Sequence, residues 1–290
     1  KVVAGITSSF ASFWDSECVT LKDALITMDI HETGRVPLPK FYSSALNSEW
    51  RFGESEAYLR EQGVLDESSR WRGAQLVIPN YMQAASNCIV STPHYLVCCL
   101  NECDGLRGEL EEALQSPTAA PSAILELVAN MTSQTTLDHD DPPALQGTLS
   151  QQLQQIADLH GGSVPLHGRL FAQWLHYAFP RECAFPHRRG AASALTPGEF
   201  GSAYLATGEE MERHANNSAE ELEPLDASWM SQWSPEEELL VGELQAPWER
   251  RSHLAVGGAA LVLVALGLGV AGWTGTSTPL LPTHHKARFV

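Results

Sequence analysis

The sequence is short of basic side chains. Its 18 lysine and arginine residues stand against 35 aspartate and glutamate residues, for a formal net charge of −17. A protein that holds nucleic acid by its phosphates needs a basic surface, and a pI near 5.0 argues against one. The shortage is uneven, because residues 1–253 hold all 35 acidic and 16 of the basic side chains, a net charge of −19. Nucleic acid is therefore not an expected partner, whereas 43% hydrophobic residues are enough for a folded core.

The sequence also lacks the short motifs of common enzymes. It has no glycine-rich phosphate loop, no Gly-x-Ser-x-Gly elbow and no His-Glu-x-x-His pair. Cys183 and His176 can be drawn as a nucleophile and its base, but a chain with 6 cysteines and 11 histidines offers such pairs by chance. We expect no catalytic residues, and hence a protein that is not an enzyme.

Long uncharged hydrophobic runs are scarce as well, and the clearest lies near the C-terminus. Residues 254–273 read LAVGGAALVLVALGLGVAGW, without one charged side chain. Twenty helical residues span about 30 Å, the thickness of a bilayer core. A buried helix of a soluble domain is the alternative, but the run is not amphipathic. We predict a single-pass membrane helix followed by a short basic tail, residues 274–290, with Lys286 and Arg288. Basic residues flank both ends, so the orientation stays open, and a start at Lys1 suits a processed chain or a fragment.

One face of this predicted helix carries small side chains. Gly258, Ala265, Gly269 and Gly272 recur at helical spacing, which favours close approach of a second transmembrane helix. The run contains no histidine and no acidic or amide side chain, so it offers no axial ligand for haem or chlorophyll. We therefore expect membrane lipid and neighbouring transmembrane subunits as partners, and no cofactor bound by transmembrane side chains.

The region before the membrane helix is predicted to be mainly α-helical. Residues 1–200 form the expected helical extramembrane domain, and residues 201–253 an acidic stalk with short helices, a solvated and partly disordered linker. The best strand candidate is residues 75–79. Helix signals predict helices from Pro93 toward Leu114, from Pro121, over residues 149–160 and from Pro165, and capping boxes at Thr196 with Glu199 and at Ser234 with Glu237.

Residues 29–40 have the spacing of an EF-hand calcium loop without its chemistry. Asp29 falls at position 1, Gly34 at the turn position 6 and Val36 at the apolar position 8. Position 12, which must supply a bidentate carboxylate, is Lys40, so calcium binding is not expected. Residues 162–166 repeat the Gly-x-Val-Pro-Leu core of this loop. The pattern is either a degenerate EF-hand-like element kept for packing or a coincidence.

An even number of cysteines favours disulfides in an oxidising compartment. Six cysteines allow fifteen pairings, so the connectivity stays open. A competing interpretation is a metal site in which Cys99, Cys103, Cys183 and His187 form a Cys₃His set. We favour disulfides and expect no metal. The cysteines are Cys18, Cys88, Cys98, Cys99, Cys103 and Cys183.

Two longer stretches carry a resemblance to a known family. They are residues 87–103, NCIVSTPHYLVCCLNEC, and residues 164–183, VPLHGRLFAQWLHYAFPREC. Together with GRVPL at residues 34–38, they resemble a lineage-restricted family of membrane-anchored proteins in dinoflagellate algae, over about residues 20–200. The resemblance brings no catalytic residues.

The resemblance implies a place in the chloroplast thylakoid membrane. We expect a non-enzymatic accessory subunit of a photosynthetic supercomplex, photosystem I with its light-harvesting antenna, that anchors by one helix and bridges or stabilises neighbouring subunits. Chlorophyll, carotenoid and lipid contacts would then be peripheral. The alternative is a membrane-anchored binding protein of the cell surface or secretory lumen, for which glycosylation sequons at Asn130 and Asn216 would be meaningful.

Overall fold

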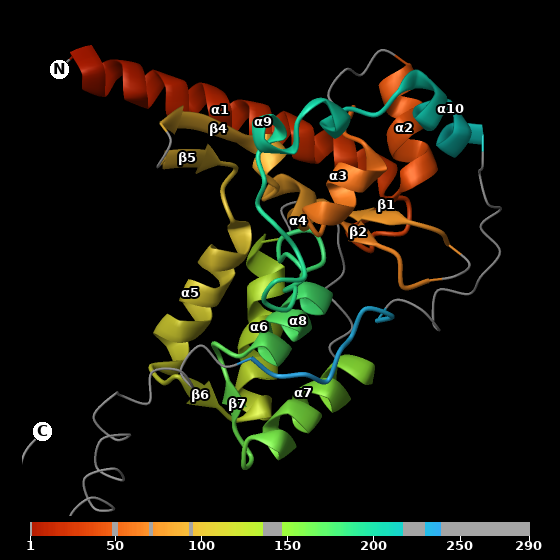
Figure 1. Ribbon diagram of the computed structural model, residues 1–290. Coiled ribbons are helices and arrows are strands. Elements are labelled where there is room, and N and C mark those ends of the chain that lie inside the picture. The colour runs from red at the N-terminus through yellow and green to blue at the C-terminus, as the bar shows by residue number, and fades with distance from the viewer. Residues whose placement is uncertain are drawn as a thin grey trace, which may run out of the picture. The chain divides into compact units, whose positions relative to one another are not determined.

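The computed structural model describes residues 2–47, 52–69, 72–92, 95–135, 147–216 and 230–238. Lys1–Leu239 form one compact unit, and the second unit, Leu240–Val290, lies outside the described residues. The described part is mainly helical, which confirms the predicted fold class at that level (Figure 1).

No helix within the described ranges is long and apolar enough to cross a membrane. The transmembrane helix predicted at residues 254–273 and the basic tail at 274–290 lie outside those ranges. So does the packing face formed by Gly258, Ala265, Gly269 and Gly272, and all three stay predictions.

The first half of the domain consists of two units, each with short strands between two helices, and the strands of the two units pair with each other. Helix α1 (Val2–Met28), β1 (Arg35–Pro37) and α2 (Leu38–Leu46) form the first unit. Helix α3 (Glu56–Glu61), β2 (Leu65–Asp66), β3 (Gln75–Val77) and α4 (Ile78–Met82) form the second. Strand β1 pairs antiparallel with β3, and Val36 lies opposite Leu76, both fully buried. Strand β3 confirms the strand predicted at residues 75–79 over its first three residues, and residues 78 and 79 begin α4 instead. A hydrophobic cluster that includes Leu25, Phe41 and Tyr81 fills the space beneath.

The second half repeats this plan. Helix α5 (Glu102–Leu114), β6 (Thr118–Ala119) and α6 (Pro121–Thr135) form one unit, and α7 (Thr148–Leu159), β7 (Val164–Pro165) and α8 (Arg169–Ala178) form the other. Strands β6 and β7 pair antiparallel, with Ala119 opposite Val164. Trp174 at the centre of a second hydrophobic cluster donates its indole N–H to the carbonyl oxygen of Leu149, 2.9 Å away. Helices α6 and α7 confirm two predicted helices, and α8 begins four residues later than predicted.

The Gly-x-Val-Pro-Leu repeat in the sequence is therefore a structural repeat. In both copies the valine lies in the short paired strand and the following residues lead into a helix. A β-branched side chain suits the paired position. The proline fixes φ as the chain leaves the strand.

The helix predicted from Pro93 is wrong over its first turns. Strands β4 (Cys88–Thr92) and β5 (Tyr95–Cys98) form an antiparallel hairpin, preceded by the 3₁₀ turn η1 (Ala85–Asn87). The β-branched Ile89, Val90 and Val97 favour strands. Only α5, beginning at Glu102, is helical as predicted.

The folded domain does not end at residue 200, where the rise in acidic residues placed the boundary. Helix α9 (Pro197–Phe200), with the predicted capping box of Thr196 and Glu199, leads into η2 (Ser202–Tyr204) and α10 (Gly208–Asn216). Tyr204 accepts the backbone N–H of Ser55, and α10 packs on α2. Glu210 of α10 accepts the backbone N–H of Glu56 at the start of α3, so this segment is part of the domain surface.

Residues 230–238, hereafter the acidic strap, also lie on the domain rather than in a solvated linker. Gln173 exchanges two hydrogen bonds with the backbone of Ser234, at 2.9 and 3.0 Å. Glu237 accepts the Leu170 N–H at the start of α8 and contacts His160 Nε2, both at 3.0 Å. The capping box predicted at Ser234 is thus wrong, since Glu237 caps α8 rather than a helix of its own.

Candidate interaction groove

A groove of about 540 Å³ runs along α1. Its opposite wall is formed by α4, by the chain between β5 and α5, and by the turn after α8, with Met82, Leu100 and Glu182 among the lining residues. Val19 and Leu100, both in this lining, are 60% and 79% exposed.

The groove is held open by covalent and polar contacts. The Cys18–Cys99 disulfide joins α1 to the opposite wall. Gln83 Nε2 donates to the carbonyl oxygens of Cys99 and Leu100 at 3.1 and 3.2 Å, which fixes the segment that presents Leu100. Lys22 Nζ meets Glu102 Oε2 at 2.6 Å. The groove is therefore preformed and does not require rearrangement to receive a ligand.

Acidic side chains outnumber basic ones among the residues that line the groove. Asp15, Asp23, Glu102 and Glu182 line it together with two cations, Lys22 and Arg181, which are paired with Glu102 and Asp29. Burial raises the pKa of the Glu182 carboxyl, so this group is held in a dehydrated position. The nearby charges of Lys22 and Arg181 already offset part of this pKa rise.

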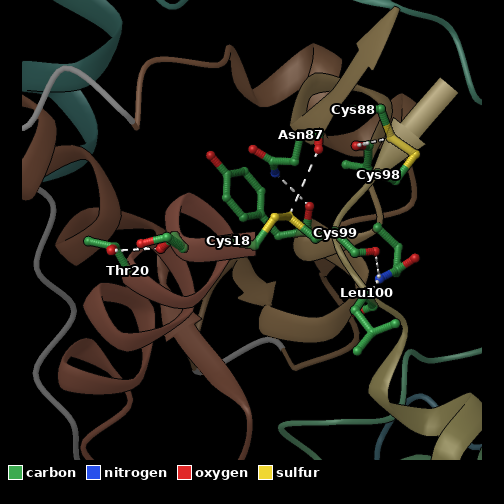
Figure 2. Close-up of a disulfide and its surroundings, with 11 residues drawn as sticks. Cys18, Thr20, Asn87, Cys88, Cys98, Cys99 and Leu100 are labelled. Carbon is green, nitrogen blue, oxygen red and sulfur yellow. Dashed lines mark hydrogen bonds between the residues drawn. A yellow bond between two sulfur atoms is a disulfide. The ribbon is translucent and has the colours of Figure 1, made fainter. Parts of the chain in front are cut away.

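All six cysteines are paired in the structure, as Cys18–Cys99, Cys88–Cys98 and Cys103–Cys183. Figure 2 shows the adjacent Cys98 and Cys99 bonded to different partners, one across the β4–β5 hairpin and one to α1. The third disulfide joins α5 to the turn after α8. The Cys₃His metal alternative fails on this connectivity, because no thiolate is left to coordinate an ion.

The loop with calcium-like spacing is closed by hydrogen bonds to Asp29 and holds an arginine. Asp29 accepts the backbone N–H groups of Thr33 and Gly34 at 3.0 and 2.8 Å, and Gly34 has φ +70°. Arg181 Nε meets the same carboxylate at 3.1 Å. A cation is thus already present at this buried carboxylate, supplied by the turn after α8. A Cβ on Gly34 would lie 1.9 Å from the carbonyl oxygen of Pro180, so the two segments are in backbone contact.

A buried polar cluster joins the two halves and the acidic strap. Arg35 Nε donates to Asp66 Oδ2 at 2.8 Å, and its Nη2 lies 3.1 Å from Gln232 Oε1 and 3.2 Å from His176 Nε2. The Arg35 guanidinium also lies over the Tyr177 ring. Burial, reinforced by the Arg35 charge, lowers the pKa of His176 to about 3. His176 is therefore neutral at physiological pH.

The candidate nucleophile pair of Cys183 and His176 has a different role in the structure. The Cys183 sulfur is bonded to Cys103, and His176 Nδ1 donates to the Cys183 carbonyl oxygen at 2.7 Å. With its proton on Nδ1, His176 presents the Nε2 lone pair to Arg35. The imidazole orients the arginine rather than activating a thiol.

The groove itself was not predicted from the sequence. Of its lining residues, the sequence singled out only Cys18 and Cys99 as candidates. The exposure of Val19 and Leu100 beside acidic side chains is visible only in the folded chain.

Among the described residues, the side chains of Glu56, Glu210 and His214 form a candidate metal-binding group, because three of their ligand atoms lie within 4.8 Å of one another. No protein-family model, curated protein or solved structure matches the chain.

Proposed function

We propose that the protein is a non-enzymatic binding subunit that holds a neighbouring protein in the α1 groove. The observation that carries this proposal is the preformed groove with Val19 and Leu100 exposed among its lining residues. Exposed apolar side chains in a concave, rigid site are typical of binding surfaces. The acidic rim selects a partner segment that combines apolar and basic side chains, such as one face of an amphipathic helix.

In this proposal each half of the domain is a degenerate EF-hand pair. The first half is built on the paired strands β1 and β3, and the second on β6 and β7. The antiparallel strand pairing, the Asp29 turn and the left-handed Gly34 support it. Arg181 takes the place of the calcium ion, so the groove is permanently formed instead of being opened by calcium. Such a module serves a constitutive structural role better than a signalling role.

The cellular role that fits these features is that of an accessory subunit in a photosynthetic membrane supercomplex, photosystem I with its antenna. The resemblance to the dinoflagellate family and the predicted helix at residues 254–273 support this context. Three disulfides support folding in an oxidising compartment. The chain would be anchored in the thylakoid membrane, and the groove would hold an extramembrane segment of a neighbouring subunit.

The test replaces the two exposed apolar side chains that line the groove with charged ones. Val19→Asp combined with Leu100→Asp should release the protein from its complex in mild detergent, because the buried carboxylates would be left without partners. The matched control is Leu159→Asp, since Leu159 is 66% exposed at the end of α7 and does not line the groove. Unchanged co-migration of the double variant, with the disulfides intact, would rule the groove out as the binding site.

A second function is favoured by the glycosylation sequons. Asn130 on α6 and Asn216 at the end of α10 are both exposed. With three disulfides, they fit a binding domain of the secretory lumen or cell surface. A mobility shift after endoglycosidase treatment of the native protein would support this alternative over the thylakoid assignment. The absence of any shift would favour the photosynthetic role.

A further inference from the structure

A cluster of two carboxylates and one imidazole lies apart from the groove, where α10 meets the start of α3. Glu210 and His214 are four residues apart and therefore project from the same face of α10. Glu56 comes from the first turn of α3. His214 Nε2 lies 3.0 Å from Glu56 Oε2, and the ligand atoms of all three side chains are within 4.8 Å of one another.

The cluster contains a buried nitrogen without a hydrogen bond. The contact between His214 Nε2 and Glu56 Oε2 is short enough for a hydrogen bond but is not aligned as one, and Nε2 is sealed from solvent. A buried polar atom left in this way carries an unrecovered desolvation cost. A ligand that accepts the nitrogen lone pair would remove this cost.

The carboxylates are oriented by groups around them. Arg60 Nη2 donates to Glu56 Oε1 at 2.5 Å, which leaves Oε2 directed at His214. The Glu56 backbone N–H donates to Glu210 Oε1 at 3.0 Å. The His214 ring packs against the Tyr42 ring, with centroids 5.2 Å apart. Outer contacts of this kind hold ligands in place before an ion arrives.

We propose that Glu56, Glu210 and His214 bind a divalent transition-metal ion, with zinc as the best match. One imidazole nitrogen and two carboxylates are a zinc ligand set, and water would complete the coordination. Two carboxylates face the ion, and Arg60 shares the charge of one of them, Glu56. At bond lengths of about 2.1 Å, ligand atoms around zinc lie roughly 3.4 Å apart, so small side-chain rotations close the site. The ion would fasten α10, and with it the beginning of the acidic region, to α3.

The experiment uses the full chain, purified with its disulfides intact in mild detergent and stripped with EDTA. Zinc chloride titrated in a calorimeter should reveal one tight site. His214→Ala and, more conservatively, Glu210→Gln should weaken that site by at least about 100-fold, since even outer contacts are worth about 10- to 100-fold. The matched control is Glu212→Gln, an exposed acid on the same helix, which should bind zinc as the unmodified chain does.

A second readout links the ion to the position of α10. Zinc should slow tryptic cleavage after the exposed Arg213 in the unmodified chain and in Glu212→Gln, but not in Glu210→Gln. Wild-type zinc affinity in the His214→Ala and Glu210→Gln variants would overturn the proposal. So would the absence of a zinc site tighter than about 100 µM, or about −5.5 kcal/mol, in the unmodified chain.

Discussion

His176 should make the folded domain sensitive to acid, and replacing it should remove that sensitivity. The imidazole is fully buried, and its pKa is lowered from 6.5 to about 3, first by burial and then by Arg35. The unfolded chain therefore binds a proton at this residue at a higher pH than the folded chain does. The contribution of His176 to stability is fully present above about pH 6.5 and is lost as the pH falls toward 3.

The difference between the ordinary histidine pKa of 6.5 and the folded-state pKa of about 3 corresponds to roughly 5 kcal/mol of unfolding free energy. Between pH 7 and pH 5 the linkage relation gives a loss of about 2 kcal/mol from this residue alone. The carboxylates of the chain add their own pH dependence, so the informative quantity is the difference between the unmodified protein and a variant.

His176→Gln is the appropriate variant. Its amide can still donate to the Cys183 carbonyl oxygen and accept from Arg35, but it does not titrate. In urea unfolding followed by circular dichroism, the variant should lose about 2 kcal/mol less than the unmodified protein between pH 7 and pH 5. His167→Gln controls for removal of a surface imidazole. Equal losses in His176→Gln and the unmodified protein would refute the buried, neutral imidazole.

The remaining predictions concern the calcium-like loop and the disulfides. Gly34→Ala should destabilise the domain by about 2–4 kcal/mol in urea unfolding, because its Cβ would collide with the Pro180 carbonyl oxygen and the residue has positive φ; a change below 0.5 kcal/mol would contradict that contact. Millimolar calcium should leave the Tm unchanged, because an arginine already neutralises the loop carboxylate; a rise of several degrees would contradict this. Replacing Cys103 and Cys183 by serine removes a link between residues 80 apart and should cost about 4–5 kcal/mol, measured by the shift in urea midpoint, whereas a loss below 1 kcal/mol would contradict the pairing.

Local signals predicted those elements whose partners are close in sequence. The capping box at Thr196 and Glu199 is present because both residues belong to one short helix. The same spacing at Ser234 and Glu237 misled, since Glu237 caps α8 more than sixty residues earlier in the chain. A capping pattern does not specify which helix N-terminus its carboxylate meets.

The hairpin before α5 shows a second limit. A threonine–proline step favoured a helix start, but the Cys88–Cys98 disulfide and the strand pairing around it prevail over that signal. The pairing of the cysteines depends on tertiary contacts that no local pattern contains. The same holds for the contact between Arg181 and Asp29, which lie 152 residues apart in the sequence. The groove has the same origin, because its walls come from four separate segments.

Site-specific photocrosslinking from the groove in intact cells tests the central proposal most directly. A photoreactive amino acid at residue 19 or residue 100 should crosslink to the same neighbouring protein, and one at residue 159, equally exposed but outside the groove, should not. Crosslinks to a shared partner from residues 19 and 100 alone are the predicted result. Identical crosslinking from all three positions, or none from residues 19 and 100, would contradict a binding role for the α1 groove.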